Sequence, residues 1–267
     1  ETNSGMLRHV YLRRGYHSGE IMLCLVTRVS LKKKIAGVLP ELLAAFPEIK
    51  SITESVNPDR TNVILGKTVS VLAGAPDISD TMCGKEIRIS PQSFYQINTA
   101  QAERLYAVGK DYAGLQGDEL LLDLYCGAGT IGLSMADAVG RLIGVEVIPE
   151  AVENARQNAE RAGITNAAFY CGDAGTIAAK LLSEGTSPDV VVLDPPRKGC
   201  DAAAIRAVVQ MRPSRIVMIS CNPATAARDA KAFGEAGYAV RKVRAVDLFP
   251  GTAHVECVVL MSGNYHN

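Results

Sequence analysis

The chain has 267 residues, enough for one large domain or two modest ones, and 48% hydrophobic with 21% charged residues indicates a packed globular protein rather than a disordered one. Its 28 basic and 28 acidic residues give a formal net charge of zero, which excludes a globally basic nucleic-acid binder. Because no apolar run reaches membrane-spanning length and no signal-peptide core opens the chain, we expect a cytoplasmic protein with no membrane partner.

The seven cysteines are scattered and form no C-x-x-C pair, a pattern that argues against a zinc site or a disulfide framework and for reduced thiols in the cytosol. We therefore predict no metal and no iron–sulfur cluster in this part of the protein. The first residue is not methionine, so we expect a piece of a longer protein, and we predict that it acts as a monomer.

The first third, residues 1–89, predicts a small α+β domain with short elements. Residues 6–14 and 20–29 have strand patterns joined by a turn, and residues 35–46 have helical spacing that Pro40 either limits or restarts. Further short strand patterns follow, at residues 49–56, 67–72 and 85–89.

Residues 90–267 have a different organisation. A helix is predicted from about Thr99 to Tyr112, with Asn98 or Thr99 as its N-cap, and strands then alternate with helices as far as residue 236. This alternation predicts an α/β fold with a doubly wound parallel sheet. The last two strand patterns, residues 239–246 and 254–261, have no helix between them, so we expect an antiparallel hairpin at the sheet edge.

A glycine-rich turn follows the strand at residues 120–124. The sequence reads L-L-D-L-Y-C-G-A-G-T-I-G-L, in which Gly127, Gly129 and Gly132 match G-x-G-x-x-G between a strand and a helix. Glycine allows positive φ and a close approach of a ligand to backbone N–H groups. Glu146 ends the next strand, where a ribose-binding acid is expected, and the pattern therefore favours a nucleoside-type cofactor over a purely structural turn.

The acids around this turn indicate which cofactor it binds. Asp123, directly before the glycines, would repel the pyrophosphate of a dinucleotide but attract an ammonium or a sulfonium group. Asp173 and Asp194 follow the next two strands, so four acids end four consecutive strands at one edge of the sheet. This arrangement resembles the class I methyltransferases, which bind S-adenosylmethionine.

Cys221 follows the strand at residues 216–220 and precedes a helix whose first residue is expected to be Pro223. Thiolates are favoured at helix N-termini, where the ordinary pKa of about 8.5 falls by about a unit or more, so Cys221 is a candidate nucleophile. The alternative is an inert buried thiol. Of the other six cysteines, we interpret Cys126 as a small packing residue and the remaining five as structural. The placement of Cys221 on the same edge as Asp194 favours the functional interpretation.

Two further features are candidates for chemistry. Asp194-Pro195-Pro196-Arg197 gives the fourth strand a rigid exit over the cofactor's reactive end. Glu256 is a lone carboxylate in the last strand, and spacing alone favours equally a general base with a raised pKa and a paired structural acid.

Four motifs occur in a fixed order: D-L-Y-C-G-A-G-T, V-L-D-P-P-R, I-S-C-N-P-A-T and D-L-F-P-G-T-A-H-V-E-C-V-V-L. In them the chain from about Ser90 onward resembles the RNA uracil-C5 methyltransferases, which make 5-methyluridine in ribosomal or transfer RNA. The segment G-M-L-R-H-V-Y-L-R-R is also similar to this family's central region, so residues 1–89 are expected to contact RNA. The N-terminal barrel and iron–sulfur cysteines that many members carry are not in this sequence.

The resemblance implies a class I methyltransferase fold for residues 90–267, a Rossmann-like doubly wound sheet with an antiparallel last strand. It also implies that Cys221 adds to C6 of uracil and that Glu256 then removes the C5 proton. S-adenosylmethionine is the implied cofactor, and its implied contacts are Gln96, Tyr125, Gly127, Gly129, Glu146, Asp173 and Asp194. Implied substrate contacts are Phe94, Asp194 and Arg197.

Several alternatives stay open at this point. The ending H-V-E-C-V-V-L-M-S and the phrase S-C-N-P-A-T favour ribosomal RNA as the partner, with transfer RNA as the alternative. D-P-P-R could also be a variant of the motif with which amino-group methyltransferases act on adenine, cytosine or glutamine. Such sites usually have an aromatic residue after the prolines, where this chain has Arg197. The chain could also be an inactive RNA-binding homologue, whereas Asp123 disfavours a dinucleotide oxidoreductase.

Overall fold

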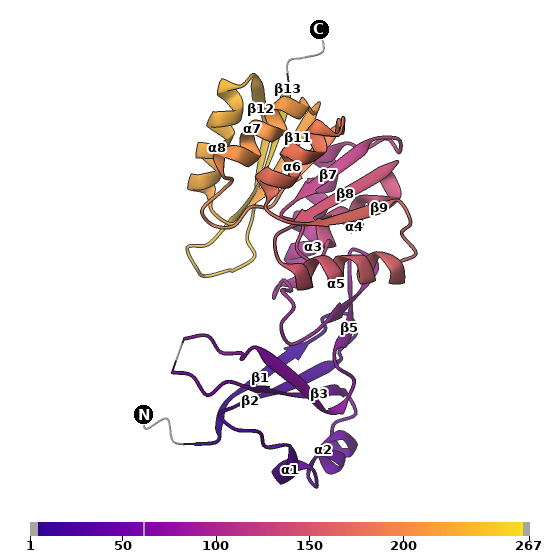
Figure 1. Ribbon diagram of the computed structural model, residues 1–267, viewed down its shortest axis with the longest axis vertical. Coiled ribbons are helices and arrows are strands. Elements are labelled where there is room, and N and C mark those ends of the chain that lie inside the picture. Colours follow the sequence, from indigo (N-terminus) through magenta and orange to yellow (C-terminus); the bar gives the residue numbers. More distant parts are fainter. Residues whose placement is uncertain (1–4, 61, 264–267) are drawn as a thin grey trace. The chain divides into compact units, whose positions relative to one another are not determined.

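The computed structural model describes residues 5–60 and 62–263, and the chain forms two compact units (Figure 1). The first comprises Glu1–Thr81 and Glu86–Tyr95, and the second comprises Met82–Lys85 and Gln96–Asn267. No helix in the described part of the chain is both long enough and apolar enough to cross a membrane.

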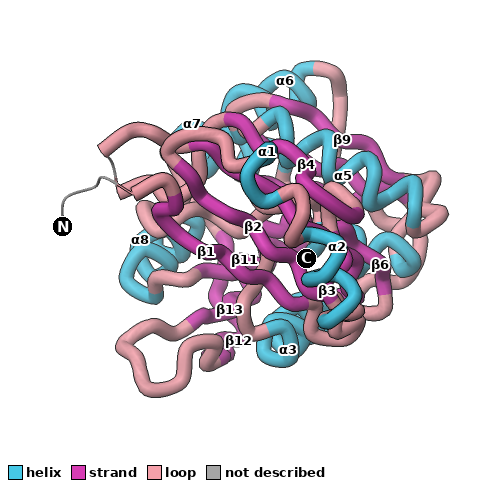
Figure 2. Tube along the Cα trace, turned by 90° about the horizontal axis from the view of Figure 1, so that it is seen from below, coloured by secondary structure: helices cyan, strands magenta, loops and turns pink. Residues whose placement is uncertain are grey.

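The first unit is built on a four-stranded sheet in the order β1-β2-β3-β4, in which only the central β2 and β3 are parallel. Figure 2 shows β1, β2 and β3 side by side. The strands are β1 (Leu7–Arg14), β2 (Ile21–Thr27), β3 (Ile49–Val56) and β4 (Thr68–Gly74). Two short helices, α1 (Lys32–Ile35) and α2 (Leu39–Ala45), connect β2 to β3. Pro40 lies in the first turn of α2, so it restarts the predicted helix rather than ending it.

A separate two-stranded hairpin, β5 (Ile78–Met82) and β6 (Lys85–Ile89), follows this sheet. The sequence patterns predicted β6 but not β5. Asp80 in β5 explains why this strand is fixed, because its carboxylate accepts hydrogen bonds from the backbone N–H groups of Tyr16 and His17 and from the Tyr95 hydroxyl. Satisfying buried backbone groups in this way ties the β1–β2 turn to the hairpin.

The second unit contains a seven-stranded sheet in the order β12-β13-β11-β10-β7-β8-β9. The strands are β7 (Leu120–Leu124), β8 (Arg141–Glu146), β9 (Ala167–Cys171), β10 (Val190–Leu193), β11 (Arg215–Ser220), β12 (Tyr238–Val246) and β13 (Glu256–Gly263). All are parallel except β13. The central strand β10 is buried throughout, as expected of a parallel strand covered on both faces. This confirms the predicted doubly wound fold.

The helices of this unit are α3 (Thr99–Ala113), α4 (Thr130–Met135) with the short 3₁₀ helix η1 (Ala136–Ala138), α5 (Pro149–Arg161), α6 (Ala174–Ser183), α7 (Ala202–Met211) and α8 (Pro223–Glu235). Four of these helices, α3, α6, α7 and α8, begin at a residue whose side chain caps them. Asn98 caps the first of them by accepting a hydrogen bond from the Gln101 N–H, and Asn222 caps the last, in which Pro223 is the first residue.

The last two strands form the predicted antiparallel pair, but its position differs from the prediction. Only β12 lies at the edge of the sheet, because β13 inserts between β11 and β12 and is antiparallel to both. In this register Ser220 lies opposite Cys257. The residues that follow β11 and begin β13 are thereby brought to the same place on the sheet, next to the end of β10.

Candidate cofactor and catalytic site

The glycine turn lies between β7 and α4 and leaves open space beside its backbone. Tyr125, Gly127 and Gly129 all have positive φ, of 65°, 55° and 81°. A Cβ added to Gly127 would have no described heavy atom within 4 Å, whereas one on Gly129 would contact three side chains at 3.2 Å. Gly127 therefore faces the space where a ligand would meet the backbone, and Gly129 permits close packing of the turn.

Asp123 is fully buried beneath this turn. Its Oδ2 accepts a hydrogen bond of 2.9 Å from the Gly132 N–H in α4, and a Cβ on Gly132 would lie only 2.7 Å from that oxygen. Its Oδ1 is buried and has no hydrogen-bond partner among the described residues. Burial, together with the charge of Glu146, raises the pKa of Asp123 to about 7. A cationic or hydrogen-donating ligand would satisfy this carboxylate.

Glu146, at the end of β8, is half-buried and faces the same turn. Its Oε2 accepts a hydrogen bond of 3.1 Å from the Gly127 N–H, and its Oε1 accepts bonds from the N–H groups of Val147 and Ile148. The carboxylate is thus held in place by backbone donors. Its Oε2 accepts only one of these bonds and retains acceptor capacity, which suits a hydroxyl group of a ribose.

Asp194, which follows β10, completes a group of carboxylates at this edge. Burial raises its pKa to about 8, with further contributions from the charges of Asp123, Glu256 and Glu146. The charges of three neighbouring carboxylates thus disfavour ionisation of Asp194, and a nearby positive charge would favour it. This group of carboxylates favours a positively charged ligand and disfavours a pyrophosphate.

Tyr106, which the sequence patterns did not single out, contacts both Gln96 and Thr130. The buried hydroxyl of Tyr106 in α3 hydrogen-bonds with the side chains of both, and Asp194 lies near enough to raise its pKa further, after burial itself. The structure thus places the predicted cofactor contact Gln96 beside the carboxylates. Tyr106 lies in the apolar stripe of α3, so its sequence context resembled that of an ordinary core residue.

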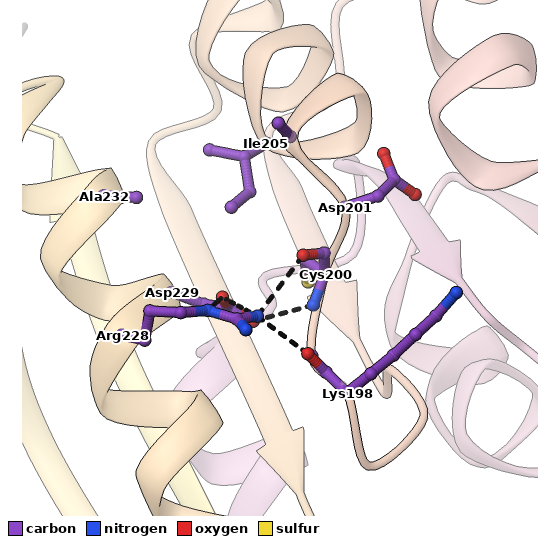
Figure 3. A pocket seen from close by; sticks show the side chains of 9 residues that line it. Lys198, Cys200, Asp201, Ile205, Arg228, Asp229 and Ala232 are labelled. Carbon is purple, nitrogen blue, oxygen red and sulfur yellow. Dashed lines mark hydrogen bonds and ion pairs between the residues drawn. The ribbon is translucent and has the colours of Figure 1, made fainter.

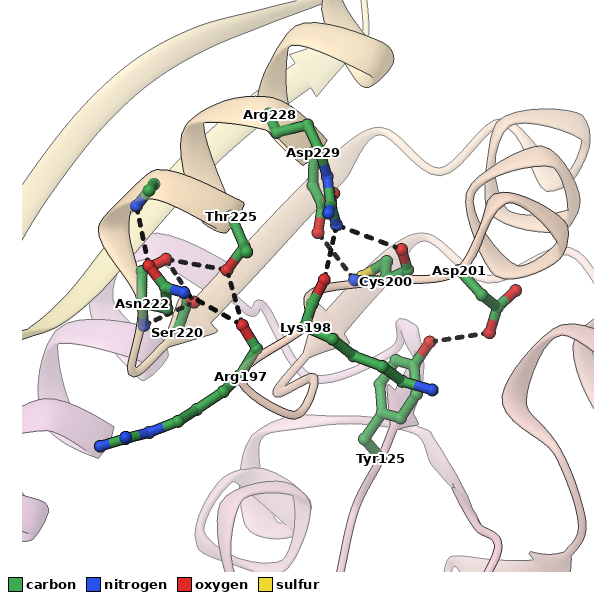
Figure 4. Close-up of polar contacts among 11 residues, drawn as sticks. Tyr125, Arg197, Lys198, Cys200, Asp201, Ser220, Asn222, Thr225, Arg228 and Asp229 are labelled. Atoms are coloured by element: carbon green, nitrogen blue, oxygen red, sulfur yellow. Dashed lines mark hydrogen bonds and ion pairs between the residues drawn. The ribbon is translucent and has the colours of Figure 1, made fainter.

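Tyr125 extends from the turn towards the loop that follows β10. Its hydroxyl lies 3.5 Å from Asp201 Oδ2 (Figure 4). The side chain of Tyr125 also hydrogen-bonds with the Cys200 thiol. Asp173 is exposed and caps α6, accepting a hydrogen bond of 2.9 Å from the Thr176 N–H. Its charge nevertheless acts on Tyr125, so the two predicted cofactor contacts lie near each other.

Cys221 and Glu256 are brought together by the β11–β13 pairing. Cys221 is partly buried between β11 and α8, and Glu256, 7% exposed, begins β13. Burial, and then the charge of Glu256, raise the pKa of Cys221 above its ordinary value, while a hydrogen bond with Arg197 opposes this rise. The prediction that the pKa of Cys221 falls was therefore wrong, because burial and the charges of Glu256 and Asp194 raise it.

The same carboxylate has the character expected of a base. Burial raises the pKa of Glu256, and the Arg197 guanidinium opposes the rise. Arg197 also lies 3.4 Å from His254 Nδ1, measured from its Nη2. Arg197 therefore contacts the groups around the thiol, whereas the sequence analysis assigned it to the substrate alone.

Phe94 belongs to the first unit and has 82% of its surface exposed. The other predicted site residues belong to the second unit, and the role of Phe94 as a substrate contact stays a prediction. In the described part of the chain, no group of three or more His, Cys, Asp or Glu side chains is arranged to hold a metal ion.

Comparison with known proteins agrees with this geometry. Residues 81–264 match the family model described as tRNA (uracil-5-)-methyltransferase. Proteins of Enterococcus faecalis and Bacillus cereus, both named uncharacterized RNA methyltransferase, are 46% and 47% identical over 97% and 98% of this chain. In each case the chain spans 57% of the relative's length.

A solved structure is also similar: the Pyrococcus abyssi tRNA (uracil-54, C5)-methyltransferase in complex with S-adenosyl-L-homocysteine. It is 30% identical, with a TM-score of 0.81, over 97% of this chain and 60% of that one. The family model covers more than half of the sequence and includes every predicted site residue, from Phe94 to Glu256. The chain therefore belongs to the tRNA (uracil-5-)-methyltransferase family.

Proposed function

We propose that this protein is an S-adenosylmethionine-dependent methyltransferase that converts uridine in RNA to 5-methyluridine through a covalent bond to Cys221. The observation that carries the proposal is the meeting of Cys221 and Glu256 across β11 and β13, beside Asp194. A nucleophile and a base at the edge of a carboxylate-lined site are the two groups that methylation of uracil C5 requires and that amino-group methylation does not.

The residues of the site fit S-adenosylmethionine. Asp123 offers a buried oxygen with no partner among the described residues, Glu146 offers a held carboxylate, and Gly127 leaves room beside the turn. The Pyrococcus abyssi relative was solved with S-adenosyl-L-homocysteine, the product form of the same cofactor. When bound, S-adenosylmethionine supplies an electrophilic methyl group on a sulfonium.

The protein's part in the reaction follows from the weak nucleophilicity of uracil C5. The Cys221 thiolate adds to C6, and the electrons of the C5–C6 double bond move into an enolate that makes C5 nucleophilic. After C5 gains the methyl group, the Glu256 carboxylate removes the C5 proton. The electrons of that C–H bond then restore the double bond and release Cys221 as thiolate, so the net products besides methylated RNA are S-adenosyl-L-homocysteine and one proton.

The RNA partner is the finer part of the proposal. The sequence around Cys221 and Glu256 favours ribosomal RNA, whereas the family model and the Pyrococcus abyssi relative are described for transfer RNA. We propose ribosomal RNA. Parallel assays with ribosomal and transfer RNA from cells that lack the protein test this choice, and methylation of transfer RNA alone would overturn it.

The covalent step is tested with RNA that carries 5-fluorouridine, because fluorine at C5 cannot leave as a proton would. The protein at its natural full length is incubated with this RNA and S-adenosylmethionine, and adducts are detected by mass spectrometry. We expect an adduct at Cys221 in the wild type and none in Cys221→Ala. Cys171→Ala, which removes an exposed thiol on β9, is the matched control and should retain the adduct.

Methyl transfer to ordinary RNA that survives in Cys221→Ala would overturn the nucleophile assignment. That result would favour an amino-group methyltransferase, and analysis of the modified nucleoside would identify it. Wild-type protein that binds RNA but neither methylates it nor forms an adduct would instead favour the inactive RNA-binding homologue.

A further inference from the structure

The loop that carries Arg197 packs against the first turns of α8, the helix that begins just after Cys221. Figure 3 shows Lys198 and Cys200 of this loop facing Arg228 and Asp229 of the helix. These residues line a cavity of about 350 Å³ that lies between the loop and the helix. One helix therefore borders both the nucleophile and the loop that carries its neighbouring cation.

Two side chains at the start of α8 hold the backbone of Arg197. Asn222 Nδ2 and Thr225 Oγ1 donate hydrogen bonds of 3.1 Å and 3.3 Å to the Arg197 carbonyl oxygen. Asn222 also caps α8 through its Oδ1, which accepts from the Ala224 N–H at 3.1 Å. The residue next to Cys221 thus links the helix start to the loop (Figure 4).

Asp229 holds the other end of the loop. It is 1% exposed, and its Oδ2 accepts a hydrogen bond of 2.7 Å from the Cys200 N–H. Its Oδ1 accepts bonds of 2.8 Å and 2.6 Å from Arg228 Nε and Nη2, and Arg228 Nη2 also donates to the Lys198 carbonyl at 2.8 Å. A buried carboxylate with charge-assisted bonds on both oxygens is a strong and rigid contact.

The fit between loop and helix is close. Gly199 has a φ of 80°, and a Cβ on it would lie 2.3 Å from Arg228 Nη2 and 2.5 Å from Asp229 Oδ2. The loop can therefore reach this position only with a glycine between Lys198 and Cys200. Such contacts restrict how far the Arg197 backbone can move relative to Cys221.

We propose that Asp229, together with Arg228, is a positioning residue that fixes this loop so that the Arg197 guanidinium faces the Cys221 thiol. The inference deepens the proposed function and rests on it for its place in catalysis. Neither Asp229 nor Arg228 touches the reacting atoms. They act by holding the backbone from which Arg197 extends.

The charges around the thiol explain why the position of Arg197 matters. Glu256 of β13 and Asp194 at the end of β10 both disfavour the thiolate, and Arg197 is the group that favours it. A small displacement of the guanidinium leaves the two carboxylates unopposed, because electrostatic interactions fall with distance. Loss of the contacts by which Asp229 and Arg228 hold the loop should therefore raise the pKa of Cys221 further.

The test measures the reactivity of Cys221 alone, without RNA or cofactor. Iodoacetamide alkylation of the Cys221 peptide is followed by mass spectrometry from pH 6 to pH 10 in the wild type, Asp229→Asn and Arg228→Gln. We expect the pH profile of both variants to move to higher pH by about half a unit to one unit, which makes alkylation at pH 7.5 about threefold to tenfold slower. Glu235→Gln, which breaks an exposed ion pair with Lys231 on the same helix, is the matched control and should not move the profile.

Arg228 has about half of its side chain exposed, so Arg228→Gln should disturb folding less than a change at the buried Asp229. It therefore tests whether these contacts position the loop even if Asp229→Asn does not fold. Circular dichroism melting identifies variants that are folded. An alkylation profile that stays at the wild-type pH in a folded variant, or that moves equally in Glu235→Gln, overturns the inference. Because no RNA is present, a shifted profile without any methyl transfer activity would support the positioning role while contradicting the proposed reaction.

Discussion

The two halves of the site are built differently, although they share one edge of the sheet. The half at β7 and β8 is made by the backbone: positive φ angles at Gly127 and Gly129 and N–H groups that donate to Asp123 and Glu146. The half at β10, β11 and β13 depends on Arg228 and Asp229 of α8, whose side chains hold the loop that carries Arg197. A site made by the backbone can be recognised from the spacing of its glycines, whereas contacts between distant side chains produce no such sequence pattern.

This difference suggests a division of labour. The first half provides a shape and a charge for the cofactor, and its parts are fixed by the chain's own turns. The second half must set the protonation of a thiol and a carboxylate, both of whose pKa values are raised by burial, and the charge of Glu256 raises the pKa of Cys221 further. Its geometry therefore depends on contacts between elements that are distant in sequence. Variants in the two halves should fail in different ways.

The largest effect is expected in the second half. Glu256→Gln removes the base but leaves Cys221 free to add to uracil, so methylated RNA should remain attached to the protein. We expect turnover to fall by about 10²- to 10⁴-fold while a covalent protein–RNA adduct accumulates on ordinary RNA. Denaturing gel electrophoresis with labelled RNA measures the adduct. Equal loss of turnover with no adduct would show that Glu256 acts before the methyl transfer step, or only structurally.

Alanine substitutions at Gly132 and Gly199 should have smaller effects, which differ between the two halves of the site. A Cβ in Gly132→Ala would clash with Asp123 Oδ2 at 2.7 Å and with Leu142 Cδ1 at 2.9 Å, and overpacking of this kind costs about 1–3 kcal/mol. We expect a lower free energy of unfolding in urea and weaker binding of S-adenosyl-L-homocysteine by calorimetry. Gly199→Ala clashes instead with Arg228 and Asp229, and should slow Cys221 alkylation without weakening cofactor binding.

The two halves would not be independent if Gly199→Ala weakened binding of S-adenosyl-L-homocysteine and Gly132→Ala slowed alkylation of Cys221. Gly127→Ala is the control for strain alone. Its Cβ would meet no described atom within 4 Å, so its cost in stability is limited to the positive φ, about 1 kcal/mol.

The smallest effect concerns the stability of the first half. The pKa of Asp123 is about 7 in the folded protein and about 3.9 in an unfolded chain, so the folded state holds the extra proton between these values. The protein therefore loses stability as the pH rises from about 4 through 7. Without cofactor, Asp123→Asn should melt at a higher temperature than the wild type at pH 8, and the difference should shrink towards pH 4. A variant that melts below the wild type at pH 8 would contradict the raised pKa.

The sequence predicted most of the sheet because buried parallel strands read as short apolar runs between helices, and it located the acids because each ends a strand. It placed Asn222 and Pro223 at the start of α8 for the same local reasons. The pKa of Cys221 could not be predicted this way, because it depends on Glu256 from a strand 35 residues later in the chain.

Other features lay outside the reach of sequence patterns. Asp229 occupies the buried face of α8 between Ala226 and Phe233, and a charged residue in an apolar stripe was the one signal that could have revealed it. Tyr106 gave no such signal. The position of β13 inside the sheet was missed because hairpin patterns specify that two strands pair, but not which of them lies at the edge.

The insertion of β13 between β11 and β12 also has a consequence for the order of assembly. A chain made from its N-terminus produces Cys221 before Glu256, and β12 lacks its neighbour in the sheet until β13 arrives. In the proposed reaction, a partly synthesised chain with the thiol but not the base has no group that removes the C5 proton and so releases the RNA. Because Glu256 begins the strand that completes the sheet, the step that makes the fold whole would also supply the base that the proposed release requires.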